Sequence, residues 1–508
     1  MSLSLQKDIT AKLLKTYLPP FKGTWKTLPA YLLPDDVLQD SLNVTLQAGR
    51  LRSRAGLLSY DSGNLGNRVL GSFLTVDTTK AKYPICSTKN TVYRYIANWE
   101  NITNGLVLNA SDSSQVRMTS LQIGTFVDIL YANGIDTVKV IPQSTYLLNN
   151  ITPYAGSIPV CTDICTSFSR IVGITPPYTI QWCDALNNTY VSYTNWPSIN
   201  QAILADTEDA LVAVRSLGTL GLAVYKEGNI FVGFPQSGPN SQAFRFEHRG
   251  EYEGPAGVNA IVNVNGTHVY MTPSGRVGLF DGTNQSFICD GLWPFLQDDI
   301  DKTYASRIFG VYNYQTSEIY FWYPRVGDAG SLKGMIIIDM PYPLAGITDF
   351  AYFLGRSSFD CSNGLSIRLF NATVSPLVFG SNNETFRLDK DTYRDKTSIF
   401  SCSLTTPLYR PTEQEGHYRP IFTLYATRDS SRGLAKVSAI VTDLLENNGV
   451  ATVSETVDLT QIPNNEYISF SDGSNQNDVG SFIGGKVEWD STAKLEYKGL
   501  DVFGRSAF

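Results

Sequence analysis

GLAVYKEGNIFVGF, at residues 221–234, opens the stretch of sequence that decides the fold. The stretch continues through NVNGTHVYM at 263–271 and TPSGRVGLF at 272–280, and it ends with RIFGVYNYQTSEIYFWY at 307–323. Runs of β-branched and aromatic residues alternate with short turns of Gly, Asn, Asp and Ser, which is the pattern of antiparallel hairpins. Consecutive aromatic residues at 320–323 point to both faces of a strand. This strand is therefore predicted to be buried on both sides.

Similar strand patterns extend outward from this stretch in both directions. FVDILYANGIDTVKVIP, at 126–142, predicts a hairpin that turns at Asn133-Gly134. Residues 147–167 are richer in Pro, Ser and Thr and predict a loop or insertion, and GLWPFLQDDIDKTYASRI at 291–308 predicts one or two helical turns. Groups of strands recur roughly every 40 to 50 residues between 65 and 393. We expect an all-β fold in which residues 65–393 form a β-propeller with blades of short antiparallel strands, and two stacked sandwiches are the alternative.

The two ends of the chain have a different character. After residue 393 at least five further strand patterns follow, which predict a C-terminal β-sandwich over 394–508. Residues 1–20 predict a short helix or an arm that ends at Pro19-Pro20. We expect residues 1–64 to form an N-terminal arm with the first strands, acting as a docking segment.

Composition limits the class of protein. The 508 residues suggest two or three domains, 17% of them are charged, 12% are aromatic, and the formal net charge is −7. Interfaces favour aromatic residues and are depleted of charge, so this surface is expected to be covered by partners. A protein that grips nucleic acid by its backbone needs a basic face, which argues against that class. A mildly acidic protein can still line a channel through which DNA passes.

The cysteines and the apolar runs indicate the environment of the chain. Seven cysteines at irregular spacing predict free, buried thiols rather than a disulfide framework. The first residues carry no apolar run of the kind found in signal peptides, and no apolar run is long enough to span a membrane. We therefore expect a chain without a leader or a membrane span.

Recognisable catalytic motifs are missing from the sequence. The three histidines are His248, His268 and His417, and none is paired in a metal-binding pattern. His268 lies in a strand pattern and is expected to be structural. Asp298-Asp299 and Asp35-Asp36 are adjacent carboxylates, whereas a glycosidase needs two carboxyls across a cleft. We expect no catalytic residue, no cofactor and no metal, although distant carboxylates leave a polysaccharide hydrolase open as a less favoured alternative.

One basic motif stands out at the end of the N-terminal segment. RLRSR places Arg50, Arg52 and Arg54 at alternating positions, so that in a strand the three side chains share one face. The ordinary interpretation is a solvated strand face. The alternative is a contact with an acidic partner surface or a phosphate, and these three arginines are our candidate partner-contact residues.

Four segments together resemble the β-propeller tail proteins of short-tailed bacteriophages, the hub or nozzle proteins of the packaged-DNA stabilisation type. The segments are LLPDDVLQDSLNVTLQAGRLRSRAGLLSYD at 32–61, FVDILYANGIDTVKVI at 126–141, TIQWCDALNNTYVSYTNW at 179–196, and the region from LGLAVYKEGNIFVGF to GTHVYMTPSGRVGLFDGTNQSFICDGLWPFL at 220–296. The likeness covers most of residues 25–325 as a pattern of strands and turns. It carries no catalytic fingerprint.

The resemblance implies a structural protein of the virion tail, made in the host cytoplasm. Such a protein forms a ring with itself, expected to be a homohexamer, beneath the portal and adaptor proteins of the head-to-tail connector. It closes the DNA channel without sequence-specific binding, retains the packaged genome, and anchors tail fibres or spikes for genome ejection. A receptor- or glycan-binding tail fibre or adhesin is the alternative function.

Overall fold

The structure is a computed structural model. It describes residues 12–17, 21–47, 49–61, 63, 65–76, 79, 81–185, 191–236, 243–340, 350–367, 375–381, 383–409, 418–428, 434–442, 450–458, 467–471, 482–493 and 495–506. Within these residues no helix is long and apolar enough to cross a membrane.

Five four-stranded antiparallel sheets follow one another along the described part of the chain. Their strands are β6 (Gly71–Val76), β7 (Lys82–Ser87), β8 (Val92–Tyr95) and β9 (Trp99–Asn101); β10 (Arg117–Ile123), β11 (Phe126–Ala132), β12 (Lys139–Ile141) and β13 (Asn149–Asn150); β15 (Asp163–Ser167), β16 (Arg170–Thr175), β17 (Thr179–Trp182) and β19 (Gln201–Ile203); β20 (Leu211–Ser216), β21 (Leu222–Lys226), β22 (Asn229–Pro235) and β23 (Phe244–Glu251); β24 (Ile261–Val264), β25 (Thr267–Met271), β26 (Val277–Phe280) and β27 (Gln285–Ile288). Successive sheets begin about 46 to 50 residues apart, which agrees with the spacing expected from the sequence.

A sixth, seven-stranded sheet completes this series. Its order is β28-β29-β30-β31-β32-β33-β5. The strands are β28 (Phe309–Asn313), β29 (Glu318–Pro324), β30 (Leu332–Asp339), β31 (Tyr352–Leu365), β32 (Leu377–Gly380), β33 (Thr385–Asp389) and β5 (Gly56–Asp61). Residues 352–356 of β31 pair with β30, Cys361 pairs with both β30 and β32, and residues 363–365 pair with β32, so this long strand is shared between two blades. The last blade takes its outer strand, β5, from the N-terminal segment.

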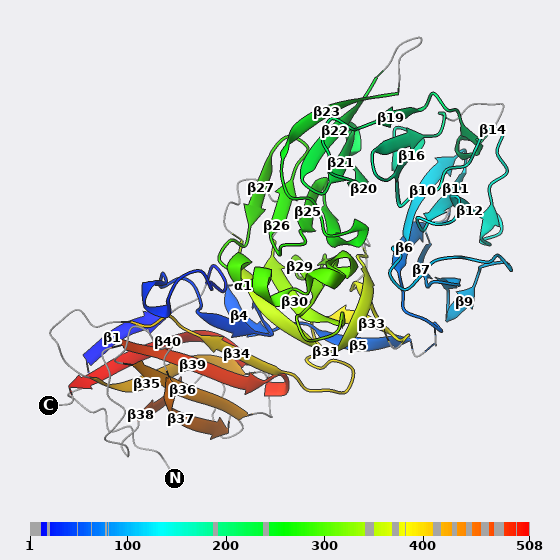
Figure 1. The fold of residues 1–508 in the computed structure, drawn as a ribbon. Coiled ribbons are helices and arrows are strands. Elements are labelled where there is room, and N and C mark those ends of the chain that lie inside the picture. The colour runs from blue at the N-terminus through cyan, green and yellow to red at the C-terminus, as the bar shows by residue number, and fades with distance from the viewer. Residues whose placement is uncertain are drawn as a thin grey trace.

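The sheets close into a ring, which makes the fold a β-propeller (Figure 1). The innermost strands contact one another in the order β6, β10, β15 and β20, and β20 contacts the 3-10 turn η4 (Val258–Ala260) that leads into β24. The series continues through β24, β28 and β31, and β31 returns to β6. With the long sheet counted as two blades, the described residues form seven blades, a size within the usual range for propellers.

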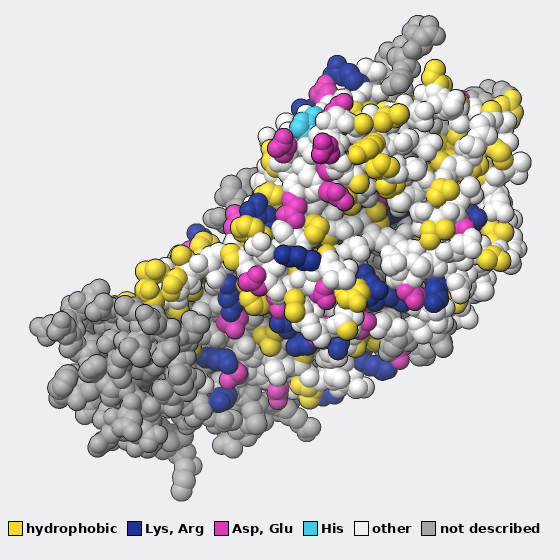
Figure 2. Space-filling model, in the orientation of Figure 1, with side chains coloured by type: hydrophobic (Ala, Val, Ile, Leu, Met, Phe, Trp, Pro, Cys, Tyr) yellow, Lys and Arg dark blue, Asp and Glu magenta, His cyan; other side chains and the backbone are white. Residues whose placement is uncertain are grey.

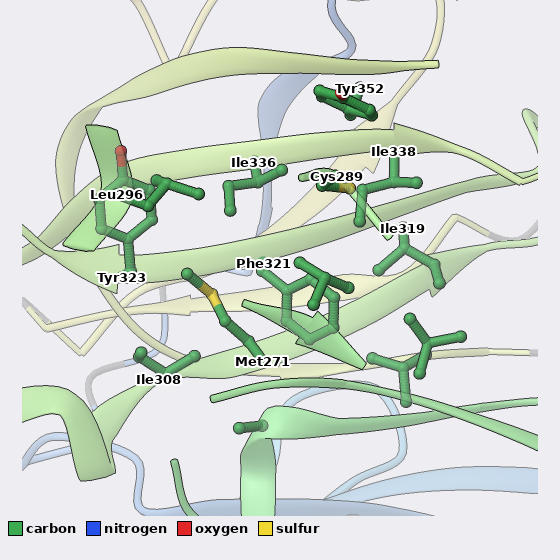
Figure 3. Close-up of a cluster of buried hydrophobic side chains, with 14 of the residues drawn as sticks. Met271, Cys289, Leu296, Ile308, Ile319, Phe321, Tyr323, Ile336, Ile338 and Tyr352 are labelled. Carbon is green, nitrogen blue, oxygen red and sulfur yellow. The ribbon is translucent and has the colours of Figure 1, made fainter. Parts of the chain in front are cut away.

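The central stretch of sequence forms its strands for the reasons that its pattern suggests. Asn265 and Gly266 both have positive φ, 54° and 94°, which gives the tight turn between β24 and β25. Every residue of β29, EIYFWYP, is buried, as predicted for a strand covered on both sides. Figure 3 shows part of the core between this strand and the preceding blade, where Met271, Cys289, Leu296, Ile308, Ile319, Phe321, Tyr323, Ile336, Ile338 and Tyr352 pack together.

A second body is built from two antiparallel sheets. One contains β1 (Lys12–Tyr17), β3 (Val44–Gln47), β4 (Arg50–Ser53), β40 (Leu495–Ser506), β35 (Tyr418–Arg428) and β38 (Tyr467–Ser471); the other contains β2 (Asp40–Leu42), β34 (Ser401–Thr405), β39 (Phe482–Asp490), β36 (Leu434–Thr442) and β37 (Val450–Asp458). Both sheets supply side chains to one buried cluster, which includes Tyr17, Leu51, Tyr497, Leu404 and Trp489. Figure 1 shows this body beside the propeller.

Residues 1–64 are divided between the two bodies. Strands β1 to β4 complete the sheets of the second body, and β5 closes the propeller. The docking arm expected here is thus strands paired with residues several hundred positions away. The sandwich expected from residues 394–508 alone stays a prediction, because the sheets described here also contain β1 to β4.

Three local expectations can be compared with the structure. For residues 1–20 a short helix or an arm was expected, and the described residues 12–17 form a strand that pairs with β40, which excludes the helix there and leaves the arm open. The segment 147–167 was expected to be a loop or insertion, and the loop is wrong in part, because the segment contains β13, the short β14 (Ala155–Gly156) and the innermost strand β15. The Ser and Thr residues of β15 hide its strand character. The helical turns expected at 291–308 are α1 (Trp293–Asp299) and η5 (Lys302–Arg307). The remaining elements are η1 (Ala30–Leu32), η2 (Ser192–Thr194), η3 (Gly218–Leu220), η7 (Ser491–Ala493) and β18 (Asn195–Trp196), which pairs in parallel with β14.

Candidate functional site

The three candidate arginines do not share one strand face. β4 ends at Ser53, so Arg54 lies just beyond it. Arg50 is exposed, Arg52 is half-buried, and Arg54 is fully buried. Both interpretations of the motif, the solvated strand face and the alternative of a partner contact, are therefore wrong for Arg54, whose side chain is fully buried. The strand ends there because the chain turns from the second body towards the propeller.

Arg54 is the centre of a buried polar cluster between the two bodies. Its Nη1 and Nη2 donate to the two carboxylate oxygens of Asp395 at 3.0 and 2.6 Å, a bidentate ion pair with both side chains fully buried. Nε donates to Oδ1 of Asn43 at 2.9 Å, and the remaining hydrogens go to the carbonyls of Ala55 and Arg356 at 2.8 and 2.9 Å. The guanidinium also lies 4.0 Å from the ring centroid of Phe400. All of its donors and one of its faces are used within the molecule.

Asn43 links the same cluster to three distant segments. Its φ of 56° places it in the left-handed region, which Asn tolerates better than most residues. Its Oδ1 also accepts from the backbone N–H of Arg356 at 2.8 Å, and its Nδ2 donates to the carbonyl of Ser401 at 2.8 Å. Asp395 accepts a further bond from the N–H of Ser358 at 2.9 Å. Strand β31 of the propeller, the N-terminal segment and the chain entering β34 are thereby held together.

A pair of carboxyls lies on the propeller side of the same junction. Glu318 and Asp339 stand opposite each other in the pairing of β29 and β30. Glu318 is almost fully buried and accepts hydrogen bonds from Thr316 at 2.6 Å, from Tyr320 at 2.8 Å, and from Thr45 of β3. Thr45 is in turn the cross-strand neighbour of Arg52. We call the residues Asn43, Thr45, Arg52, Arg54, Glu318, Asp339, Arg356 and Asp395 the junction site.

The electrostatics of the carboxyl pair follow from this position. Burial raises the pKa of Glu318, and its hydrogen bonds and the positive charge of Arg52 oppose that rise. Burial, with the nearby charge of Glu318, raises the pKa of Asp339 to about 7. Asp339 therefore changes protonation near neutral pH. Arg52, one of the candidate partner-contact residues, therefore already has an acidic group of its own molecule, Glu318, within electrostatic range.

Groups that could carry chemistry elsewhere are engaged in the fold. Among the described residues no cluster of three or more His, Cys, Asp or Glu could hold a metal ion. His268 is buried, with Nδ1 2.8 Å from the hydroxyl of Tyr225 and Nε2 3.1 Å from the carbonyl of Ser216, so the expected structural role is confirmed. His417 lies outside the described residues. All seven cysteines are free and buried, as predicted, and burial raises the pKa of each thiol, to about 12 for Cys161.

An open hollow of about 330 Å³ lies on the second body. It is lined by Leu42, Ser401, Cys402, Ser403, Lys436, Glu488, Trp489 and Asp490. The indole of Trp489 faces inward, where its Nε1 donates to Ser53 at 3.0 Å. The hollow is therefore lined by both polar and apolar side chains, and Trp489 is almost fully buried at its wall.

The sequence alone could not assemble the junction site. Arg54 and Asp395 are separated by 341 positions, and Thr45 and Glu318 by 273. One signal was available, since Glu318 begins a strand that is otherwise aromatic and aliphatic. A carboxyl at the head of such a strand indicates a buried, hydrogen-bonded acid.

Comparisons with known proteins give likeness of fold without likeness of sequence. No family model matches the chain, and no curated protein matches it. The β-propeller domain of Cps50 (Swd1) from Myceliophteria thermophila is similar with a TM-score of 0.41 and 6% identity, over 66% of this chain and 100% of that one. U3-55K is similar with a TM-score of 0.41 and 8% identity, over 68% of this chain and 100% of that one. A chain of a mitotic checkpoint complex is similar with a TM-score of 0.42 and 11% identity, over 66% of this chain and 93% of that one. The propeller fold follows from the sheets of this chain and the contacts between their innermost strands.

Proposed function

We propose that this chain is a structural component of a bacteriophage tail, a nozzle or hub that extends and closes the DNA channel below the connector. The observation that carries the proposal is the connection between the two bodies. A closed propeller is tied to a second body by shared N-terminal strands and by the buried Arg54–Asp395 pair. Such a part transmits force between its two bodies without a flexible linker, which suits a protein that retains pressurised DNA.

The exposed surface supports assembly with partners. Large hydrophobic side chains stand out from the propeller, including Val107 at 77%, Ile199 at 74% and Ile203 at 65% exposed. Figure 2 shows hydrophobic side chains gathered over the blades that carry β10 and β16 in Figure 1. Exposed apolar surface of this kind is typical of proteins that function in assemblies. The expected partners are further copies of the chain in a ring, connector proteins and tail fibres.

The experiment has two parts. The purified chain is mixed with the connector proteins of its own phage, and the complex is imaged by electron microscopy. We expect a ring of this chain, of six copies, below the connector. Particles assembled without the chain are expected to lose their DNA. A chain that stays monomeric with the connector, together with particles that keep their genome without it, would contradict the proposal.

Glycan binding is the second candidate, and the open hollow on the second body is the observation that favours it. Lys436 and Glu488, cross-strand neighbours there, are suitable hydrogen-bonding groups for a sugar. A glycan array with the full chain tests this function, with the double substitution Lys436→Ala and Glu488→Ala as the matched variant. Specific binding that this variant loses would favour a receptor-binding role over a purely mechanical one.

A further inference from the structure

The axis of the propeller is crossed by polar side chains at one end. Nε2 of Gln115, just before β10, donates to the carbonyl of Ser306, and Oε1 accepts from the N–H of Val258 at 2.6 Å. Nδ2 of Asn259 donates to the carbonyl of Leu70 at 3.1 Å. These bonds join blades that are far apart around the ring. The end of the axis therefore carries a layer of hydrogen-bonded polar side chains.

Three charged side chains lie next to this layer on successive innermost strands. They are Arg117 of β10, Asp163 of β15 and Arg215 of β20. Arg215 forms an ion pair with Oδ2 of Asp163 through Nη1, and its Nη2 donates to the carbonyl of Val258, the residue that Gln115 holds.

The oxygens of Asp163 are occupied by other donors. Oδ2 also accepts from the N–H of Val214 at 2.8 Å, and Oδ1 accepts from the N–H of Ile164 at 2.9 Å. Asp163 is thus committed to Arg215 and to two backbone groups.

Arg117 is left without an equivalent partner. Its Nε is 3.9 Å from Oδ1 of Asp163, which is too long for a hydrogen bond. Within the described part of the chain, the buried Nε atoms of both Arg117 and Arg215 have no hydrogen-bond partner. The side chain of Arg117 is 29% exposed and that of Arg215 only 6%. One guanidinium is therefore reachable from solvent, while the other is enclosed.

The local charges do not balance. Two guanidinium groups share one carboxylate. Burial and the charge of Arg215 lower the pKa of Arg117 to about 10, and the same two effects lower the pKa of the nearby His268 to about 4. The imidazole is neutral above that pH and adds no charge of either sign. Arg117 is partly exposed and shares the carboxylate of Asp163 with Arg215, so a second anion would balance the charge of the two guanidinium groups.

We propose that the propeller axis binds one small oxoanion, of the class of inorganic phosphate or sulfate, between the guanidinium groups of Arg117 and Arg215. The planar fork of a guanidinium matches the oxygens of such an ion. The unpartnered Nε donors supply further hydrogen bonds. The ligand is a free ion rather than a polymer, so this proposal is independent of the proposed role in DNA retention.

Calorimetric titration of the full chain with inorganic phosphate tests the proposal. The buffer contains no other oxoanion and has its ionic strength fixed with chloride. We expect saturable binding of about one phosphate per chain, which sulfate displaces, and a melting temperature that rises with phosphate concentration. Arg117→Gln is expected to weaken binding by about 10-fold or more, and Arg117→Lys by less, because lysine keeps the charge and loses the fork.

Arg387→Gln is the matched control, since Arg387 lies on β33, away from the innermost strands, and its side chain is 46% exposed. It is expected to leave phosphate binding unchanged.

If Arg117 had only a structural role, the variant Arg117→Gln would be less stable than the wild type at every phosphate concentration. The proposal instead predicts that this variant is at least as stable as the wild type without phosphate and gains nothing from it. Absence of saturable binding to the wild type, or an equal phosphate response in Arg117→Gln, would overturn the proposal. If Arg117→Gln does not fold, the comparison of Arg117→Lys with wild type decides, and equal affinities would overturn it.

Discussion

Arg54 shows how far a buried charge depends on complete pairing. Burying a guanidinium is tolerable only where every donor finds an acceptor and a carboxylate balances the charge. Asp395, Asn43 and two backbone carbonyls meet that requirement here. The residue therefore fixes the junction between the two bodies.

Replacing Arg54 by Met is expected to lower the free energy of unfolding by about 3–5 kcal/mol, because Asp395 is left as an uncompensated buried charge. Urea denaturation followed by tryptophan fluorescence measures this. Arg50→Met, at an exposed position of the same motif, is expected to change stability by no more than about 0.5 kcal/mol. In the double variant Arg54→Met with Asp395→Leu, most of the loss should be recovered, and a strictly additive loss would argue against a coupled pair.

Asp339 gives a pH dependence whose sign can be worked out. Its pKa rises from an ordinary value near 4 to about 7 on folding, so between these pH values the folded state binds more protons than the unfolded state. The contribution of Asp339 to stability is therefore present at pH 4 and is lost as the pH rises through 7.

Asp339→Asn should remove this decline, so that the variant gains stability relative to the wild type as the pH rises from 4 to 8. Free energies of unfolding at several pH values give the difference directly. Asp391→Asn, at an exposed carboxyl, is the control and should track the wild type. A constant difference between Asp339→Asn and wild type across this range would show that the carboxyl does not titrate there.

At the scale of elements, β5 and β31 decide how the ring is closed. β31 belongs to two blades because its two halves pair with different neighbours. β5 brings residues from the N-terminal segment to the outer edge of the last blade. Closure by a strand from the other end of the chain is a long-range contact, and it makes ring stability depend on that one strand.

Leu57 and Leu58 of β5 separate core packing from strand pairing. Leu57 is fully buried in the core of the last blades, whereas Leu58 is half-buried on the other face. Leu57→Ala is expected to cost about 2–5 kcal/mol and Leu58→Ala clearly less, as measured by chemical denaturation. Equal effects would indicate that β5 does not pack into the blade as described.

At the scale of the whole molecule, the seven buried thiols report on integrity. They are distributed over both bodies, all are buried, and burial raises the pKa of each thiol. A thiol reagent such as Ellman's reagent is expected to react very slowly with the native chain. In denaturant it is expected to react with all seven cysteines. Fast reaction of one or two cysteines in the native chain would show that one body opens independently of the other.

The sequence by itself determined the all-β class, the spacing of the blades and the doubly buried strand at 318–324. These follow from alternation, from turn residues such as Asn265-Gly266, and from composition, all of which act over a few neighbouring residues. It also predicted the free thiols and the structural role of His268. The phage-tail role remains our proposal.

Only the tertiary structure decided which distant segments meet. Nothing near Arg54 in the sequence distinguishes it from Arg50 or Arg52, yet it is buried because Asp395, 341 positions away, lies opposite it. The same holds for the pairing of β5 with β33 and for the hydrogen bond from Thr45 to Glu318. It also holds for Arg117 and Arg215, which both lie near the carboxylate of Asp163. The physical reason is that burial and charge pairing depend on distance in space, and a closed ring brings together residues that the sequence keeps apart.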